Sequence, residues 1–350
     1  MKRLIAVLVV VALVMGGAFA QISFGAWGRG MLVPVQVAPG AEIKDATTTV
    51  AASWGGNPRI GFTIRGSSDN IGFQVDMLGD TNKVMDPTDP KKEKELGTFI
   101  SVGDNAFIYW ANDMFKVSIG KVQGDALRGK FGDSPFGGSL TGWTGNADQD
   151  NIFTRFYPKC GALVEARPVE GLYVGVAFEG NKSAKESYTD TIQAGVGYTG
   201  DFGQVRAQYI GKAQGERVEV AFAPSLSGVA LDIGAKIPLD KSYKAVVAVG
   251  SAFNVADVAV TARADVKIAD TTNAKFYVIP SMGFDFGTIG MDVFVDTTFA
   301  KDAGVGFLVA PWYSKGYANG YIKAAVAATK AAAKDAKLGW AVPVIFEYWF

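Results

Sequence analysis

The side chains that most often carry out catalysis are sparse in this sequence. Its 350 residues contain no histidine and a single cysteine, Cys160. Imidazole acid–base chemistry, serine–histidine triads and histidine-ligated metal sites are therefore excluded. One cysteine forms neither an internal disulfide nor a zinc cluster. Because Cys160 shares an apolar alternation with Phe156 and Ala162, we expect its thiol to be buried or lipid-facing rather than reactive.

Two further segments are weak candidates for ligand binding. Residues 124–131 nearly reproduce a phosphate-binding loop, but Phe131 stands where a serine or threonine would bind Mg²⁺, and no strand-to-helix context surrounds the segment. Asp80, Asp86 and Asp89 match the spacing of no calcium loop and lie beside three lysines, which favours a solvated loop. We therefore expect no enzymatic activity, no cofactor and no metal.

The charge balance excludes another class of function. The chain carries 34 basic and 34 acidic residues, so no electrostatic footprint indicates a nucleic-acid partner. The remaining candidates for a functional site are charged residues of alternating segments and of one long connection. They are Arg29, Arg59, Arg65, Asp125, Asp133, Arg155, Arg167, Arg206 and Arg263.

Strands are the elements that must position these residues. Apolar Ile60, Phe62 and Ile64 interleave with polar neighbours, and the pattern restarts at Ile71 after a turn at 66–69. A period of two is typical of strands, and two such runs around a turn predict a hairpin. The same alternation recurs to the C-terminus. It predicts an apolar face that includes Phe62, Phe73, Val176, Tyr209 and Val260, and a charged face that includes the arginines above.

The first twenty residues predict export. Lys2 and Arg3 precede twelve apolar residues, and Ala18-Phe19-Ala20 forms a small-x-small cleavage site. This pattern is typical of a secretory signal peptide, and the apolar run is too short for a membrane-spanning helix. We assign residues 1–20 to the signal peptide and 21–350 to a single domain. No helix-length apolar segment follows Ala20, so this domain could span a membrane only as a closed barrel.

The connections between strands alternate between short turns, such as the one expected at 314–316, and longer segments, as in an outer-membrane barrel and unlike a sandwich. We predict an all-β, transmembrane, antiparallel, up-and-down β-barrel of about eighteen strands, with sixteen as the alternative. Trp27 and the aromatic residues near strand ends are expected in interfacial girdles. The alanine- and lysine-rich residues 323–338 predict either a short helix or a frayed strand with a loop. The longer connections are expected at about 36–58, 79–98, 123–150, 180–190 and 329–338.

Two motifs resemble a known family. The last strand alternates through Phe346, Tyr348 and the terminal Phe350, and it resembles the insertion signal that the barrel-assembly machinery reads in bacterial outer-membrane barrels. In the third long connection, Pro135 to Gly138 is similar to the Pro-Glu-Phe-Gly-Gly stretch of the constriction loop in general diffusion porins. The glutamate of that stretch is missing here. The strand expected from Arg155 to Arg167 also resembles the porin hairpin after that loop.

The resemblance implies a water-filled, often trimeric channel in the outer membrane for passive diffusion of ions and small hydrophilic solutes. It also implies that the extracellular loop 123–150 folds into the barrel, which would place Asp125 or Asp133 opposite Arg29, Arg59, Arg65 and Arg155. The expected partners are outer-membrane lipids, the assembly machinery and two further copies of the chain in a possible homotrimer. The alternative is a structural or adhesive surface protein that uses the barrel as an anchor.

Overall fold

A computed structural model of the chain describes residues 21–51, 59–86, 89–129, 131, 152–158, 160–180, 188–241, 243–300 and 303–350. The expected signal peptide and Asp133 lie outside the described residues, as do most of residues 123–150. The side chains of Asp80, Asp86 and Asp89 are outside the description as well.

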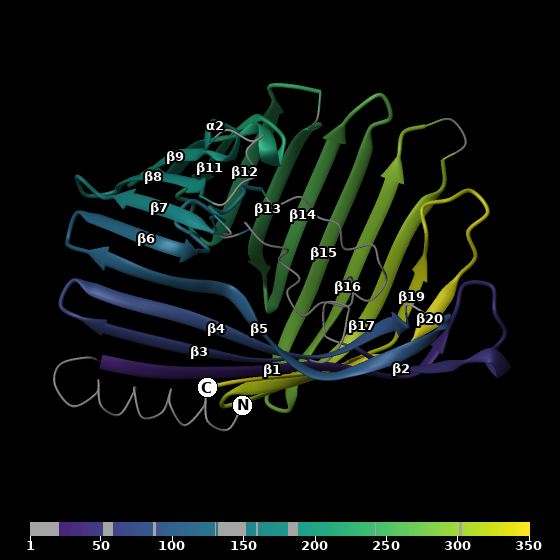
Figure 1. Cartoon of the computed structure of the whole chain (residues 1–350). Coiled ribbons are helices and arrows are strands. Elements are labelled where there is room, and N and C mark those ends of the chain that lie inside the picture. The colour runs from purple at the N-terminus through teal and green to yellow at the C-terminus, as the bar shows by residue number, and fades with distance from the viewer. Residues whose placement is uncertain are drawn as a thin grey trace.

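Antiparallel strands make up most of the described chain (Figure 1). The helical elements are short: η1 (Ile43–Asp45), α2 (Tyr188–Thr191) and η3 (Lys212–Gln214). Among the described residues, no helix is long and apolar enough to cross a bilayer. The strands are β1 (Gln21–Val37), β2 (Thr47–Ala51), β3 (Arg59–Ser68), β4 (Ile71–Asp86), β5 (Asp89–Ala111), β6 (Phe115–Lys121), β7 (Gly161–Ala166), β8 (Leu172–Glu179), β9 (Gln193–Gly200), β10 (Gly203–Ile210), β11 (Arg217–Pro224), β12 (Val229–Pro238), β13 (Ala245–Val255), β14 (Val258–Ile268), β15 (Asn273–Phe284), β16 (Gly287–Thr298), β17 (Val305–Tyr317), β18 (Gly320–Ala325), β19 (Ala327–Lys330), β20 (Gly339–Ala341) and β21 (Val344–Trp349).

The sheet closes on itself with eighteen strand positions. Strands at neighbouring positions follow one another in the sequence, and β21 closes the sheet by pairing with both β18 and β1. Three positions are each shared by two segments: β2 with β3, β18 with β19, and β20 with β21. Residues 21–29 of β1, for example, pair with β3, whereas residues 31–36 pair with β2. The 21 segments therefore fill 21 − 3 = 18 positions, which confirms the predicted eighteen-stranded antiparallel barrel over the sixteen-stranded alternative.

Two local predictions are wrong, and for one segment the structure decides between the two predicted alternatives. The expected loop at 79–98 is instead a continuation of the β4–β5 hairpin, in which Asp80 pairs with Phe99. The turn expected at 314–316 comes at 318–319, because β17 and β18 pair as far as Tyr317 and Gly320. Residues 323–330 form no helix. They complete β18 and form β19, because pairing with β17 and β21 outweighs their helix propensity.

The strand after the longest connection also begins later than predicted. It starts at Gly161, so Arg155 and Tyr157 precede β7 rather than alternate along it. Cys160 lies immediately before this strand and is exposed, so of the two expected environments, buried or lipid-facing, the buried one is wrong.

Burial along the strands is inverted relative to a soluble sheet. On β11, Glu219 is fully buried while its neighbour Val220 is 39% exposed, and on β12 the same holds for Asp232 and Ile233. The apolar face of the sheet is therefore the outer face of the barrel, and the polar face is the inner one, as in a barrel that contacts lipid.

Candidate functional site on the inner face of the barrel

Two arms of the longest connection cover part of the inner face. We call residues 122–129 and 131 the first docked arm and residues 152–158 the second docked arm. They pair through Gly124 and Phe156, whose backbone N–H and C=O groups exchange hydrogen bonds of 2.8 and 3.0 Å. Leu127, Phe131 and Phe153 are at most 3% exposed and belong to one buried cluster with side chains of β7, β8, β11 and β13. The arms are therefore packed against the wall of the barrel.

Glycines on the inner face make room for these apolar side chains. Gly195 and Gly197 lie beneath Leu127, and Gly250 lies beneath Phe131. A Cβ atom on Gly250 would approach Phe131 Cγ to 2.5 Å, and one on Gly195 would approach Leu127 Cδ1 to the same distance. Part of the glycine content of the chain is thus explained by close approach of the arms to the strands.

Glu219 on β11 holds the second arm. Its carboxylate accepts hydrogen bonds from Thr154 N at 2.7 Å, Thr154 Oγ1 at 2.6 Å and Gln208 Nε2 at 2.7 Å. Arg217 Nε lies 2.7 Å from the same carboxylate, and Lys236 Nζ lies 3.9 Å away. Because two cations and three neutral donors surround one buried acid, the charge of Glu219 is well compensated.

Arg206 on β10 holds the first arm. Its guanidinium forms a buried ion pair with Asp232 on β12 and donates a 3.1 Å hydrogen bond to the carbonyl of Leu127. The intervening β11 presents Ala221, which pairs with Arg206 and with Gly234. These small residues let the guanidinium reach across a strand.

Arg263 on β14 has the same arrangement. It pairs with Asp265 two residues along the strand, at 2.7 Å, and donates to the carbonyl of Phe131 at 3.2 Å. Arg206 and Arg263 are each 2% exposed. They therefore lie on the inner face but beneath the docked arms, neutralised by aspartates, and not on an open surface.

Asp125 and Arg155 meet within the docked arms. Asp125 Oδ1 lies 3.2 Å from Arg155 Nε and 3.6 Å from Arg128 Nη1, and half of the Asp125 side chain is exposed. Burial and the neighbouring Arg155 lower the pKa of Arg128 to about 10, with Asp125 opposing the shift, so Arg128 stays charged at neutral pH. Tyr157 donates to Asp104 at 3.3 Å, and burial followed by Asp104 raises its pKa.

The other early arginines lie elsewhere. Arg29 on β1 pairs with Glu347 at 3.3 Å and stacks on Trp27, 5.0 Å from the ring centroid. Trp27 thus shares the inner face with Arg29 and is not part of an outer girdle. Arg65 is exposed on β3 and donates to Gln74 at 3.0 Å. Within the described contacts of Asp125, the partners are Arg128 and Arg155 rather than these residues.

Arg59 and Arg167 complete the predicted set. Arg59 begins β3 and faces Arg29 in the β1–β3 register. Arg167 follows β7 at the end of the barrel that carries the short turns, and its guanidinium lies 5.3 Å from the centroid of the Tyr173 ring. The structure thus brings Asp125 and Arg155 together and distributes the remaining described candidates around the inner face.

The inner face of β1, β15–β17 and β21 is largely apolar, which the alternation of the sequence did not predict. Met31, Tyr277, Phe294, Leu308 and Ile345 form a fully buried cluster contributed by β1, β15, β16, β17 and β21. Beside it, Asp292 on β16 accepts from Trp312 Nε1 at 2.7 Å and pairs with Lys323 at 3.3 Å. Several of these strands are therefore apolar on both faces.

The sequence interpretation missed the acids that neutralise the arginines. Glu219, Asp232 and Asp265 all lie on the polar parity of their strands, which was the available signal. Their partners include residues far along the chain, such as Thr154 with Glu219, 65 residues apart. Within the described chain, no group of three histidine, cysteine or acidic residues is arranged to hold a metal ion.

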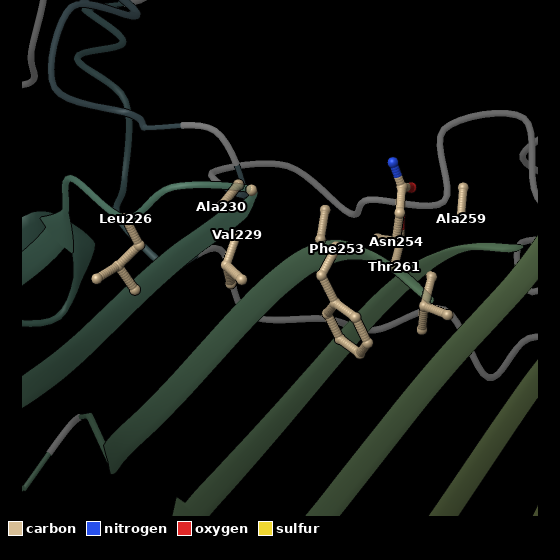
Figure 2. A pocket seen from close by; sticks show the side chains of 10 residues that line it. Leu226, Val229, Ala230, Phe253, Asn254, Ala259 and Thr261 are labelled. Atoms are coloured by element: carbon tan, nitrogen blue, oxygen red, sulfur yellow. The ribbon is translucent and has the colours of Figure 1, made fainter. Parts of the chain in front are cut away.

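Two hollows lie at the end of the barrel that carries the short turns, the first at β12–β14 and the second at β7–β10. The first, about 450 Å³, is lined by uncharged residues including Ala230, Asn254, Ala259 and Thr261. Figure 2 shows Asn254 and Phe253 on opposite sides of β13 at this rim. The second, about 460 Å³, lies between Ala126 of the docked arms and residues of the β7–β8 turn and β8–β10, among them Arg167.

Comparison with solved structures decides the type of barrel. The chain is similar to OmpF of Salmonella typhi, solved in complex with daunomycin, at 12% identity over 94% of this chain and 97% of that one, with a TM-score of 0.50. The fold is that of the bacterial porins. A triple mutant of the Rhodopseudomonas blastica porin matches at 13% identity over 94% of this chain and 100% of that one, with a TM-score of 0.50.

The porin fold extends over nearly the whole chain. An anion-selective porin from Comamonas acidovorans matches at 10% identity over 95% of this chain and all of that one, with a TM-score of 0.50. No family model and no curated protein sequence matches the chain. The likeness is therefore one of fold, and it agrees with the resemblance to porins found in the sequence.

Proposed function

We propose that this porin-fold barrel forms a water-filled channel for passive diffusion of ions and small hydrophilic solutes across the outer membrane. The observation that carries the proposal is the combination of eighteen closed strands with a charged inner face. Barrels of this size are too wide for wall side chains alone to fill, and known barrels of sixteen to eighteen strands leave an aqueous passage.

The docked arms support a narrowed passage. They cover the inner face of strands between β7 and β14 and are fixed there by Arg206, Glu219 and Arg263. We infer that the connection 123–150 as a whole narrows the channel. The passage then runs past exposed polar side chains of β3–β6, such as Arg65 and Asp104.

Selection by charge follows from the same arrangement. Asp125 and Arg155 are partly exposed on the docked arms, with Arg128 beside them. In a confined passage such charges act through a medium less polarisable than bulk water, so they favour hydrated ions and dipolar solutes over apolar ones. Asp133 belongs to the same proposal through its place in the sequence.

The proposed route to the membrane uses both ends of the chain. Residues 1–20 act as the export signal, and Phe346, Tyr348 and Phe350 act as the signal for the assembly machinery. In support of this, Phe350 exchanges two backbone hydrogen bonds of 2.9 Å with Ala26, where the last strand meets the first. A homotrimer in the outer membrane is part of the same proposal.

Reconstitution of purified, folded protein into planar bilayers tests the function. A diffusion channel gives steady openings whose current is linear with voltage, with a conductance that rises with salt concentration. Silence from protein that is shown to be folded by heat-modifiable migration on gels would contradict the proposal and favour the surface-anchor alternative.

A further inference from the structure

We infer that the second hollow, which we call the Arg167 niche, binds a small zwitterion of the α-amino acid class, and this inference deepens the proposed channel function. The niche has a volume of about 460 Å³ and lies between Ala126 of the docked arms, the β7–β8 turn and the ends of β8–β10. A solute that enters the barrel from the short-turn end passes this position.

Arg167 supplies a cationic group that is available to a ligand. Its guanidinium lies over the ring of Tyr173, and the phenol of Tyr173 is fixed by a 3.1 Å hydrogen bond to Glu165. Among the described residues, no carboxylate lies within ion-pair distance of Arg167, and the residue is exposed. A stacked, unpaired guanidinium keeps its planar set of donors free for a carboxylate.

Acceptors for an ammonium group line the same niche. Glu170 lies in the turn three residues after Arg167 and is exposed. Gln204 donates its amide nitrogen to Thr199 Oγ1 at 3.2 Å, which leaves the amide oxygen of Gln204 and the hydroxyl proton of Thr199 for a ligand. The niche therefore offers one cation, one anion and a hydrogen-bonding pair.

This balance favours one ligand class. A single guanidinium beside a single carboxylate has no net charge, so a dianion such as phosphate is not attracted overall, whereas a zwitterion places each of its charges against an opposite one. The first hollow at the same rim has a similar volume but no charged lining residue (Figure 2). The difference is one of chemistry rather than of size.

The test measures binding without relying on conduction. Saturation-transfer NMR on the folded barrel in detergent compares glutamine with glutaramate, which lacks the ammonium group, and with 4-aminobutanamide, which lacks the carboxylate. We expect glutamine to bind at least about tenfold more tightly than either analogue, as one charged hydrogen-bonded contact is lost in each. Arg167→Gln should weaken glutamine binding by a similar factor, and Glu170→Gln should abolish the preference for glutamine over glutaramate.

Arg65→Gln is the matched control, because Arg65 is another exposed inner arginine, and it should leave binding unchanged. Equal binding of the three compounds, no binding of glutamine, or full binding by the Arg167→Gln variant would overturn the inference. Bilayer recordings on the same preparation separate the two proposals. A barrel that binds the zwitterion but does not conduct would contradict the channel proposal and support the binding site. A barrel that conducts but does not bind the zwitterion would support the channel proposal and contradict the binding site.

Discussion

Replacing Glu219 with glutamine should release the docked arms from the wall. The carboxylate receives Thr154 N and Gln208 Nε2 on one oxygen, and Thr154 Oγ1 and Arg217 Nε on the other. A glutamine amide presents NH₂ to one of these pairs whichever way it is turned, and it removes the negative charge that Arg217 and Lys236 face.

The expected size of the effect follows from this loss. Only the bonds of Glu219 to Thr154 differ between docked and released arms, because Arg217 and Lys236 lie on the wall. A hydrogen bond to a charged group is worth about 1.5 to 3 kcal/mol, which corresponds to a shift of about 10- to 150-fold in the balance between docked and released arms. The barrel itself should remain closed, because its backbone pairing does not involve the Glu219 side chain.

Single-channel recording in planar bilayers detects the release. We expect the Glu219→Gln channel to flicker between the parental conductance and a larger one, while the parent stays at one level. Glu216→Gln serves as the control, because Glu216 accepts a hydrogen bond from the Tyr209 hydroxyl and neither residue belongs to the docked arms. A folded Glu219→Gln barrel with the parental conductance and no added noise would refute the role of Glu219 in holding the arms.

Three further outcomes are expected. Deleting Phe350 removes two backbone hydrogen bonds to Ala26, each worth about 1 kcal/mol, and it should slow assembly in cells; insertion of the truncated chain at the parental rate and yield would show that the terminal residue is dispensable. In a Cys160→Ser background, a membrane-impermeant thiol reagent should label Arg65→Cys and spare Phe62→Cys, since Phe62 is on the apolar outer face; the opposite pattern would refute the register. Arg155→Glu places a second acid beside Asp125 and should shift reversal potentials in a salt gradient toward cations, and an unchanged potential would remove this pair from the selecting region.

The strands could be predicted because alternation is a local property. Each amphipathic run, such as that of Ile60, Phe62 and Ile64, reports its own two faces. The structure of residues 323–330 was harder to predict. Their alanines favour a helix locally, whereas pairing with β17 and β21 makes them strands.

The candidate site was harder to predict than the strands. The polar parity located Arg206 and Arg263, but not the fact that Asp232 and Asp265 neutralise them beneath the arms. Contacts such as that between Arg263 and Phe131, 132 residues apart, depend on how the long connection returns to the wall. The apolar cluster of Tyr277 and Phe294 was missed because both faces of its strands are apolar.

The connection between β6 and β7 is proposed to narrow a water-filled lumen. Deleting residues 126–145 and recording single channels of the refolded barrel tests this narrowing. A narrowed lumen predicts that the deletion variant has a larger unitary conductance than the intact chain and passes solutes that the intact chain excludes. An unchanged conductance and size limit in a folded deletion variant would contradict it.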